Sequence, residues 1–96
     1  MRTITHGDVV AAARAILSRP EGAARRDVAR WLEQAHAADL FRRRFRRCHP
    51  LFGNGSLAGA VPYVPGPEPF LSDERYLQAI ATVIEAILDW RHRRAG

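Results

Sequence analysis

The chain has 96 residues and a net charge of +5. A chain this short is expected to form one domain, residues 1–96, with one modest core and no large catalytic cleft. Hydrophobic residues make up 47% of it and charged residues 26%, which excludes wholesale disorder. The positive charge favours an acidic partner, such as nucleic acid, anionic lipid or an acidic protein surface.

All fifteen basic residues are arginine, and sixteen alanines accompany them. Arginine binds phosphate and carboxylate groups with two parallel hydrogen bonds, so its use indicates anion recognition. GC-rich codon usage is the alternative explanation for the missing lysine, and the alanines favour it. Codon usage does not explain why the arginines are clustered.

The cysteine content and the first residues predict a cytoplasmic protein. One cysteine rules out an internal disulfide framework. The first eight residues lack the apolar region of a signal peptide, and no apolar run is long enough to span a bilayer.

Helical spacing predicts two helices in the first half of the chain. The first, residues 6–18, has Thr5 as its cap and Asp8 as the acid of a capping box, and it ends before Pro20. The second, residues 22–47, contains apolar residues at alternating spacings of four and three. This spacing is typical of a helix that packs along a neighbour.

A turn and an extended stretch follow. Gly53-Asn54-Gly55 favours a tight turn, and Ser56 is expected to cap a short helix at residues 56–60. Four prolines between residues 62 and 69 predict a semi-rigid, Pro-rich strap.

The final helix is expected at residues 73–93, with Ser72 as its cap. Its apolar residues form an arc that approaches half the circumference. A face this wide suits two neighbouring helices, or one neighbour and a second subunit.

These elements predict an all-α fold: a small three-helix bundle with a long central helix, a short extra helix and the Pro-rich connecting strap. The expected core residues are Val9, Ala13, Ile16, Leu17, Val28, Trp31, Leu32, Ala35, Phe45, Leu77, Ile80, Ile84, Ile87 and Leu88.

The spacing of the second helix places Arg42 where an apolar residue is expected. A buried guanidinium group without a partner is very costly. Either the helix has left the core by this turn, or an acid on the final helix pairs with Arg42. If the long helices run antiparallel, Asp73 and Glu74 are the nearest acids, and we expect this paired arrangement.

The arginines at the end of the second helix are the candidate binding site. On a helical wheel, one broad face carries Arg42, Arg43, Arg46 and Arg47. Phe41 and Phe45 lie together on another face and anchor the patch. Such a patch can bind phosphates, with affinity that falls as salt rises. The alternative is a solvated helix end that local acids and water satisfy. Asp39 and Arg43, four residues apart, predict an exposed ion pair.

No set of side chains indicates catalysis, so we expect a non-enzyme without cofactor or metal. Cys48 is interpreted as a small buried residue in a capping turn rather than a nucleophile. No second cysteine or histidine pair makes a metal site with it. The Gly53-Asn54-Gly55-Ser56 stretch lacks the ending of a phosphate-binding loop and does not follow a strand.

Two stretches resemble a known family. Residues 49–57, His-Pro-Leu-Phe-Gly-Asn-Gly-Ser-Leu, follow an Arg-rich helix end, and His6-Gly7-Asp8 opens an alanine-rich helix. Together they resemble small alphaproteobacterial proteins of a family with no assigned activity. The resemblance implies a bacterial, cytoplasmic protein from a GC-rich genome, and it supplies no functional residues.

Two functional hypotheses follow. The first is an accessory protein that binds an acidic partner, nucleic acid first, through the arginine cluster. The alternative is a protein-interaction module or homodimer that uses the apolar face of the final helix.

Overall fold

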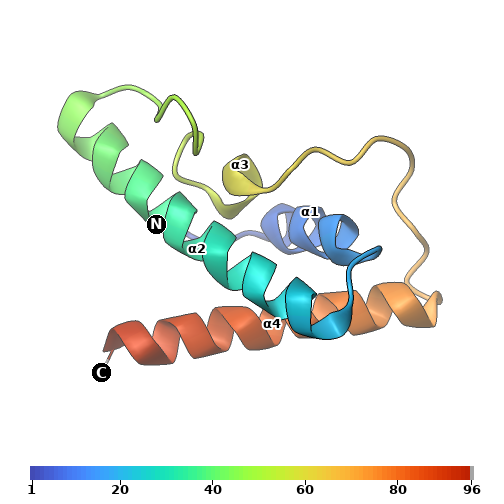
Figure 1. Ribbon diagram of the computed structural model, residues 1–96. Helices are drawn as coiled ribbons and strands as arrows, with labels where there is room; N and C mark the ends of the chain where they lie inside the picture. The colour runs from blue at the N-terminus through green and yellow to red at the C-terminus, as the bar shows by residue number, and fades with distance from the viewer. Residues whose placement is uncertain (96) are drawn as a thin grey trace.

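The computed structural model describes residues 1–95 and is all-helical, with no strand in that range (Figure 1). This confirms the predicted all-α class. The helices are α1 (His6–Ile16), α2 (Glu21–Phe45), α3 (Leu57–Ala60) and α4 (Glu74–Ala95).

The beginnings of α1 and α3 agree with their predicted caps. The Thr5 side chain accepts a hydrogen bond from the Asp8 N–H, while the Asp8 carboxylate accepts from the Thr5 N–H at 2.8 Å. This is the expected capping box. At α3, the Ser56 Oγ accepts from the Gly59 N–H at 3.1 Å. Short-range chemistry is enough to define both ends.

The sequence predicts Ser72 as the cap of α4, but in the structure the cap is Asp73. Asp73 Oδ1 accepts hydrogen bonds from the backbone N–H groups of Arg75, at 2.9 Å, and Tyr76. Both residues are good caps by type, and the carboxylate also suits the positive end of the helix dipole.

Helix α2 ends at Phe45, two residues earlier than predicted. Arg46 has a φ of 57° and a ψ of 34°, which is left-handed, and its N–H donates to the Arg42 carbonyl. After this turn, His49 and Gly53 exchange two backbone hydrogen bonds and fold the chain back. A left-handed residue commonly ends a helix by this type of bond, although glycine usually holds the position.

The two long helices run in the same direction. Near the start of α2, Arg25 contacts Glu85, and two turns later Glu33 accepts a hydrogen bond from the Trp90 Nε1–H at 2.8 Å. The contacts therefore advance along both helices together, and the ribbons diverge toward their C-terminal ends (Figure 1). The expected antiparallel arrangement is wrong, because the long connection through α3 carries the chain back before α4 begins.

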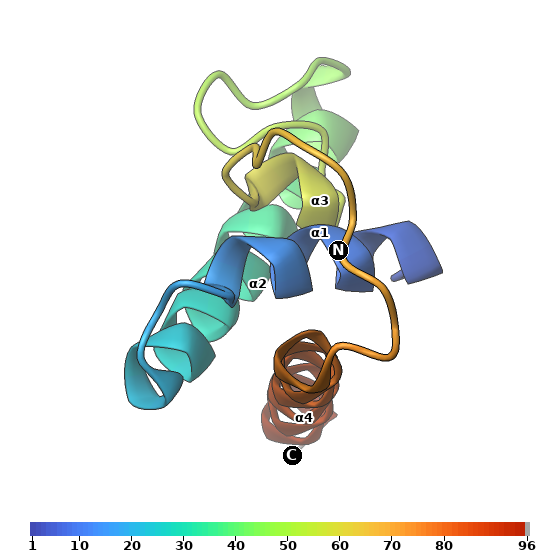
Figure 2. The ribbon, with the colours of Figure 1, turned by 90° about the vertical axis from the view of Figure 1, so that its right-hand side faces the viewer.

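The core lies where α1 crosses α2 and α4. Figure 2 shows α4 nearly end-on beneath α1. The buried apolar residues are Ala12, Ala13, Ile16, Ala24, Val28, Trp31, Leu32, Ala35, Ala38, Leu57, Tyr76, Ala79, Val83, Ala86 and Trp90. This set contains six of the residues expected in the core: Ala13, Ile16, Val28, Trp31, Leu32 and Ala35.

Eight other predicted core residues are not fully buried. Four of them pack half-buried at the edge of the core: Val9, Leu17, Ile80 and Ile87. Four are exposed, and their prediction is wrong: Phe45, Leu77, Ile84 and Leu88. On α4 the reason is that small residues face the neighbouring helices. Ala79 and Ala86 allow α1 and α2 to approach closely, so the large aliphatic side chains lie on the outer side.

Within residues 1–95, none of the helices combines the length and the apolar content that a membrane crossing requires.

Candidate anion-binding site at the end of α2

The last turn of α2 and the residues after it carry five arginines. Arg43 and Arg44 are exposed on the last turn, while Arg42 is half-buried. Arg46 and Arg47 lie beyond the end of the helix, where the chain turns away. The four predicted site residues therefore do not form one helical face. They lie on the last turn of the helix and just beyond its end instead.

Arg42 has no acidic partner within residues 1–95, so its expected pairing with Asp73 or Glu74 is wrong. These acids lie at the opposite end of the molecule because α2 and α4 run in the same direction (Figure 1). Phe45, one turn later, is 51% exposed, so it is not packed in the core either. The other alternative holds: α2 has left the core by this turn.

Asp39 is the acid that faces this site, and it is buried rather than exposed. Its Oδ2 lies 3.0 Å from Arg43 Nη2 and 3.3 Å from the amino nitrogen of Met1. Neither cation approaches Oδ2 along a hydrogen-bonding direction. The predicted pair of Asp39 and Arg43 therefore forms, but the Asp39 carboxylate is buried. The charge of Asp39 is already opposed by the amino group.

Aromatic side chains support the arginines. Phe41 and Phe45 lie together as predicted, with ring centroids 4.6 Å apart. The His49 ring contacts Phe41 edge-on and stacks on Phe52 with centroids 4.6 Å apart. The sequence did not indicate that His49 and Phe52 would join this cluster, because the turn that returns them to α2 depends on the early end of the helix.

Two guanidinium groups lie over these rings. The Arg44 guanidinium carbon is 5.6 Å from the centroid of Phe45, and that of Arg47 is 5.8 Å from the centroid of Phe41. In the part of the chain that the structure describes, Arg44, Arg46 and Arg47 have no acidic partner. A guanidinium over an aromatic face keeps its charge and its hydrogen-bond donors available to an anion.

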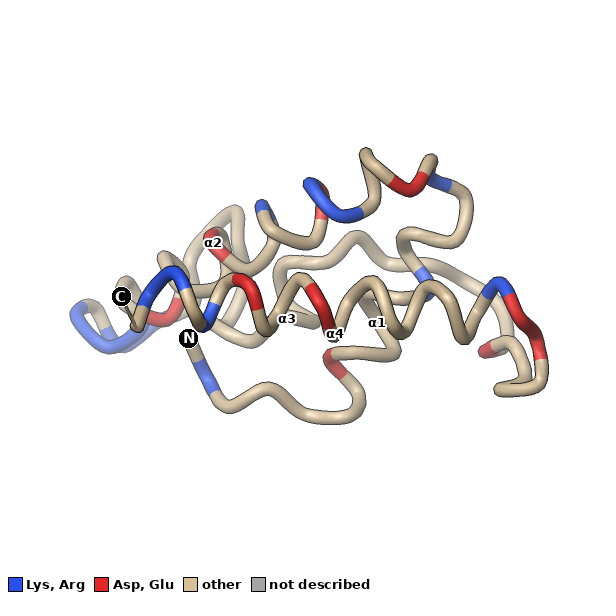
Figure 3. The backbone as a smooth tube through the Cα atoms, turned by 90° about the horizontal axis from the view of Figure 1, so that it is seen from below, with Lys and Arg blue, Asp and Glu red and all other residues tan. Residues whose placement is uncertain are grey.

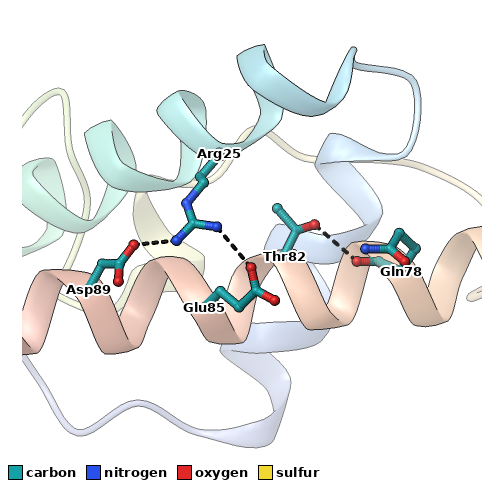
Figure 4. Close-up of polar contacts among 5 residues, drawn as sticks. All are labelled: Arg25, Gln78, Thr82, Glu85 and Asp89. Atoms are coloured by element: carbon teal, nitrogen blue, oxygen red, sulfur yellow. Dashed lines mark hydrogen bonds and ion pairs between the residues drawn. The ribbon is translucent and has the colours of Figure 1, made fainter.

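The middle of the molecule differs, because arginines there are paired. Arg25 bridges α2 and α4 by contacts with both Glu85 and Asp89 (Figure 4). The hydrogen bond from Arg25 holds the pKa of the Asp89 carboxyl below its usual range. Asp89 lies four residues before Arg93 on its own helix, but it pairs with Arg25 instead. Acidic side chains thus pair with arginines between α2 and α4, and few acidic side chains lie near the end of α2.

Cys48 and His49 have separate environments. Cys48 is exposed, so the expectation of a small buried residue is wrong. His49 Nδ1 accepts hydrogen bonds from the backbone N–H groups of Leu51 and Phe52, at 3.0 and 3.1 Å. These bonds stabilise the turn after α2 and occupy the nitrogen that a general base would use.

The Gly53-Asn54-Gly55-Ser56 stretch is structural, as predicted. Asn54 Oδ1 accepts hydrogen bonds from the N–H and Oγ of Ser56. Gly55 has a φ of 94°, and a Cβ atom there would lie 2.9 Å from the Asp39 Cα. The loop therefore packs against α2 beside Asp39 and holds the free end of the helix in place. The spacing along the sequence gave no signal of this contact.

Comparisons with known proteins identify a family for this chain. No curated protein and no solved structure matches the chain. A family model described as a domain of unknown function, DUF7742, matches residues 2–87, which include all of α1, α2 and α3 and most of α4. The resemblance to a family without assigned activity is confirmed, and its alphaproteobacterial origin stays a prediction. The chain belongs to this family, the domain of unknown function DUF7742.

Proposed function

We propose that this protein, a small three-helix bundle with a short extra helix and a Pro-rich strap, binds nucleic acid through the end of α2. It acts as a non-enzymatic accessory protein in the bacterial cytoplasm. The contact residues are Arg42, Arg43, Arg46 and Arg47, and Arg44 joins them because it is exposed beside Phe45.

The unbalanced charge at this end of the helix supports the proposal most directly. Asp39 is the acid in contact with the cluster, and it already faces the Met1 amino group. Four neighbouring guanidinium groups have no acid within residues 1–95: Arg42, Arg44, Arg46 and Arg47. Closely spaced cations repel one another, and a polyanion relieves this repulsion while it releases its counterions.

The aromatic side chains favour single strands over duplexes. Phe45 is half exposed beside the arginines, so it offers an aromatic surface to a nucleic-acid base. Single-strand binding proteins combine a positive surface with such stacking platforms. The five arginines lie on the last turn of the helix and just beyond it. Proteins that read the major groove instead place a whole recognition helix in the groove, against the base edges.

Fluorescence anisotropy with labelled single-stranded DNA, single-stranded RNA and duplex DNA tests the proposal. We expect binding to all three at about 50 mM salt, tighter for the single strands, and a marked loss of affinity at about 200 mM. Replacing Arg44, Arg46 and Arg47 by Gln removes three phosphate contacts. It should weaken binding and reduce the slope of log K against log salt by about 2 for single strands.

A matched control has the same net charge as this triple variant. It replaces Arg26, Arg30 and Arg93, which are exposed on other parts of the surface. We expect this control to bind almost as well as the unaltered protein. Equal losses in the two triple variants would show that only net charge matters, and no binding of any probe at low salt would reject the proposal.

The second candidate function is protein association through α4. Its outer side carries three half-exposed aliphatic residues: Leu77, Ile84 and Leu88, at 48%, 46% and 49% exposure. Aliphatic residues grouped on one helical face often mark an interaction site. Light scattering on the purified protein tests self-association, because a monomer at all concentrations would contradict it.

A further inference from the structure

The aliphatic residues on the outer side of α4 follow a regular pattern. Leu77, Ile84 and Leu88 are exposed. With the half-buried Ala81 they are spaced by four, three and four residues. At 100° per residue they lie within a narrow stripe, on the side opposite the buried residues of the helix. In Figure 3, which views the molecule from below, no other helix crosses in front of α4. The stripe therefore has the spacing of a two-helix seam without a partner in this chain.

Charged residues continue the same stripe at both ends. Glu74 is three residues before Leu77, and Arg91 is three residues after Leu88. Both side chains are exposed, and neither forms an ion pair with another residue of the described chain. The spacing along the stripe is thus the same from either end, and its two limits carry opposite charges.

We infer that two copies of this protein associate through α4, side by side and antiparallel, about a two-fold axis between residues 82 and 83. This inference rests on the second candidate function and specifies its partner as a second copy. Residue numbers in facing positions then sum to 165. Glu74 faces Arg91 of the second copy, Leu77 faces Leu88, and Ala81 faces Ile84. Each contact occurs twice, as a two-fold interface requires.

The charges select this orientation. In a parallel pair, Glu74 would face Glu74 and Arg91 would face Arg91, so like charges would meet at both ends. The antiparallel pair replaces them with two Glu74–Arg91 ion pairs. On one flank of the seam it also brings Ile80 of one copy beside Ile87 of the other. These isoleucines are half-buried in the single chain, and the pairing would cover them further.

The charges at the two ends of α4 agree with this orientation. Its first turn carries Glu74, and its last turn carries Arg93 and Arg94. Antiparallel pairing places the basic end of each copy toward the acidic end of the other. Because residues 74–91 make only about five helical turns, about 27 Å, we expect a weak dimer, visible at micromolar and higher concentrations.

Sedimentation equilibrium of the purified protein from about 5 to 500 μM tests the pairing. We expect a monomer–dimer equilibrium that Leu88→Gln weakens at least ten-fold. Leu40→Gln is the matched control, because Leu40 is a helical leucine with 52% exposure on α2. Circular dichroism shows whether each variant keeps its helices. A monomeric unaltered protein, or equal effects of the two variants, would overturn the inference.

Charge exchange tests the register. Glu74→Arg and Arg91→Glu should each weaken self-association at least ten-fold, because like charges then meet at both ends of the seam. The double variant Glu74→Arg/Arg91→Glu should restore it. An equimolar mixture of the two single variants should also restore it, because each chain then supplies what the other lacks. Glu21→Arg, which changes the net charge equally in the first turn of α2, should leave the dimer intact.

These results separate the inference from the function on which it rests. If Leu88→Gln prevents dimerisation but the charge exchanges have no effect, α4 does associate and the antiparallel register is wrong. If no variant and no concentration gives a dimer, both fail. Binding of nucleic acid by the end of α2 is measured independently and does not depend on either result.

Discussion

Tyr76 places its hydroxyl group inside the molecule, at the point where α4 begins. Its side chain is fully buried, and the hydroxyl donates a 2.6 Å hydrogen bond to Glu68 Oε1. Glu68 belongs to the extended stretch between α3 and α4, so one hydrogen bond ties this stretch to the core. Burial, and then this bond, raise the pKa of Tyr76 to about 12. Folding therefore favours the protonated phenol.

This pKa leads to a prediction at alkaline pH. Because the folded pKa lies above the ordinary value of 10, the stabilisation is complete below pH 10 and is lost as pH rises toward 12. In a Tyr63→Phe variant, Tyr76 is the one phenol left. Its ultraviolet titration should have a midpoint of about 12, and adding Glu68→Gln should lower it. A midpoint near 10 while the circular dichroism remains helical would contradict this.

At the scale of the elements, Asp8 connects two helices that are distant in sequence. It is 4% exposed, and its Oδ2 accepts from Thr5 in the capping box while its Oδ1 accepts from the Ala58 N–H at 3.0 Å. One carboxylate thus caps α1 and also accepts from the first turn of α3. Its position in the sequence indicates the cap and gives no sign of the second role.

Replacing Asp8 by Ala should therefore cost more than the loss of a cap. It leaves two backbone N–H groups without partners in a part-buried site, so we expect a loss of about 2–3 kcal/mol in the free energy of unfolding. Asp73→Ala is the matched control, because Asp73 caps α4 from an exposed position. That change should cost about 1 kcal/mol. Urea denaturation of both variants measures the difference, and equal losses would show that the bond to Ala58 contributes nothing.

At the scale of the whole molecule, the N-terminal segment, α2 and α4 meet at His36. Its Nδ1 lies 2.9 Å from the Met1 amino nitrogen, and its ring contacts Trp90 edge-on. The pKa of His36 is lowered, first by burial and then by the positive charges of the Met1 amino group and Arg94. The acids Glu33 and Asp39 oppose this shift. The amino group can donate to Nδ1 only while the imidazole is neutral.

This contact predicts that the fold is less stable in mild acid. Between the lowered pKa and the ordinary value of 6.5, the unfolded chain binds a proton that the folded chain does not. The contribution of His36 is therefore complete above pH 6.5 and is lost as the pH falls through the folded pKa. Thermal melts at about pH 7.5 and 5.5 should show a lower melting temperature at the lower pH.

His36→Gln is the control for this effect. It keeps a polar side chain of similar size that does not titrate, so the difference between the two pH values should shrink. A difference of the same size in the variant would assign the acid sensitivity to other groups.

The sequence by itself determined what depends on neighbours within a turn or two. It predicted the all-α class, the capping box of Thr5 and Asp8, the Ser56 cap and the Phe41–Phe45 contact, because side chains three or four residues apart meet on any helix. It also identified the arginine cluster, which is a property of composition and order.

Only the tertiary structure decided how the helices face one another. Periodicity shows that α4 has a wide apolar surface, but it does not say which part contacts α1 and α2. The parallel course of α2 and α4 depends on the path of a long connection. That path sends Arg42 away from Asp73 and Glu74, leaves Leu88 and its stripe in solvent, and brings Asp39 into the interior. Contacts between distant segments are set by packing and closest approach, which spacing along the chain does not encode.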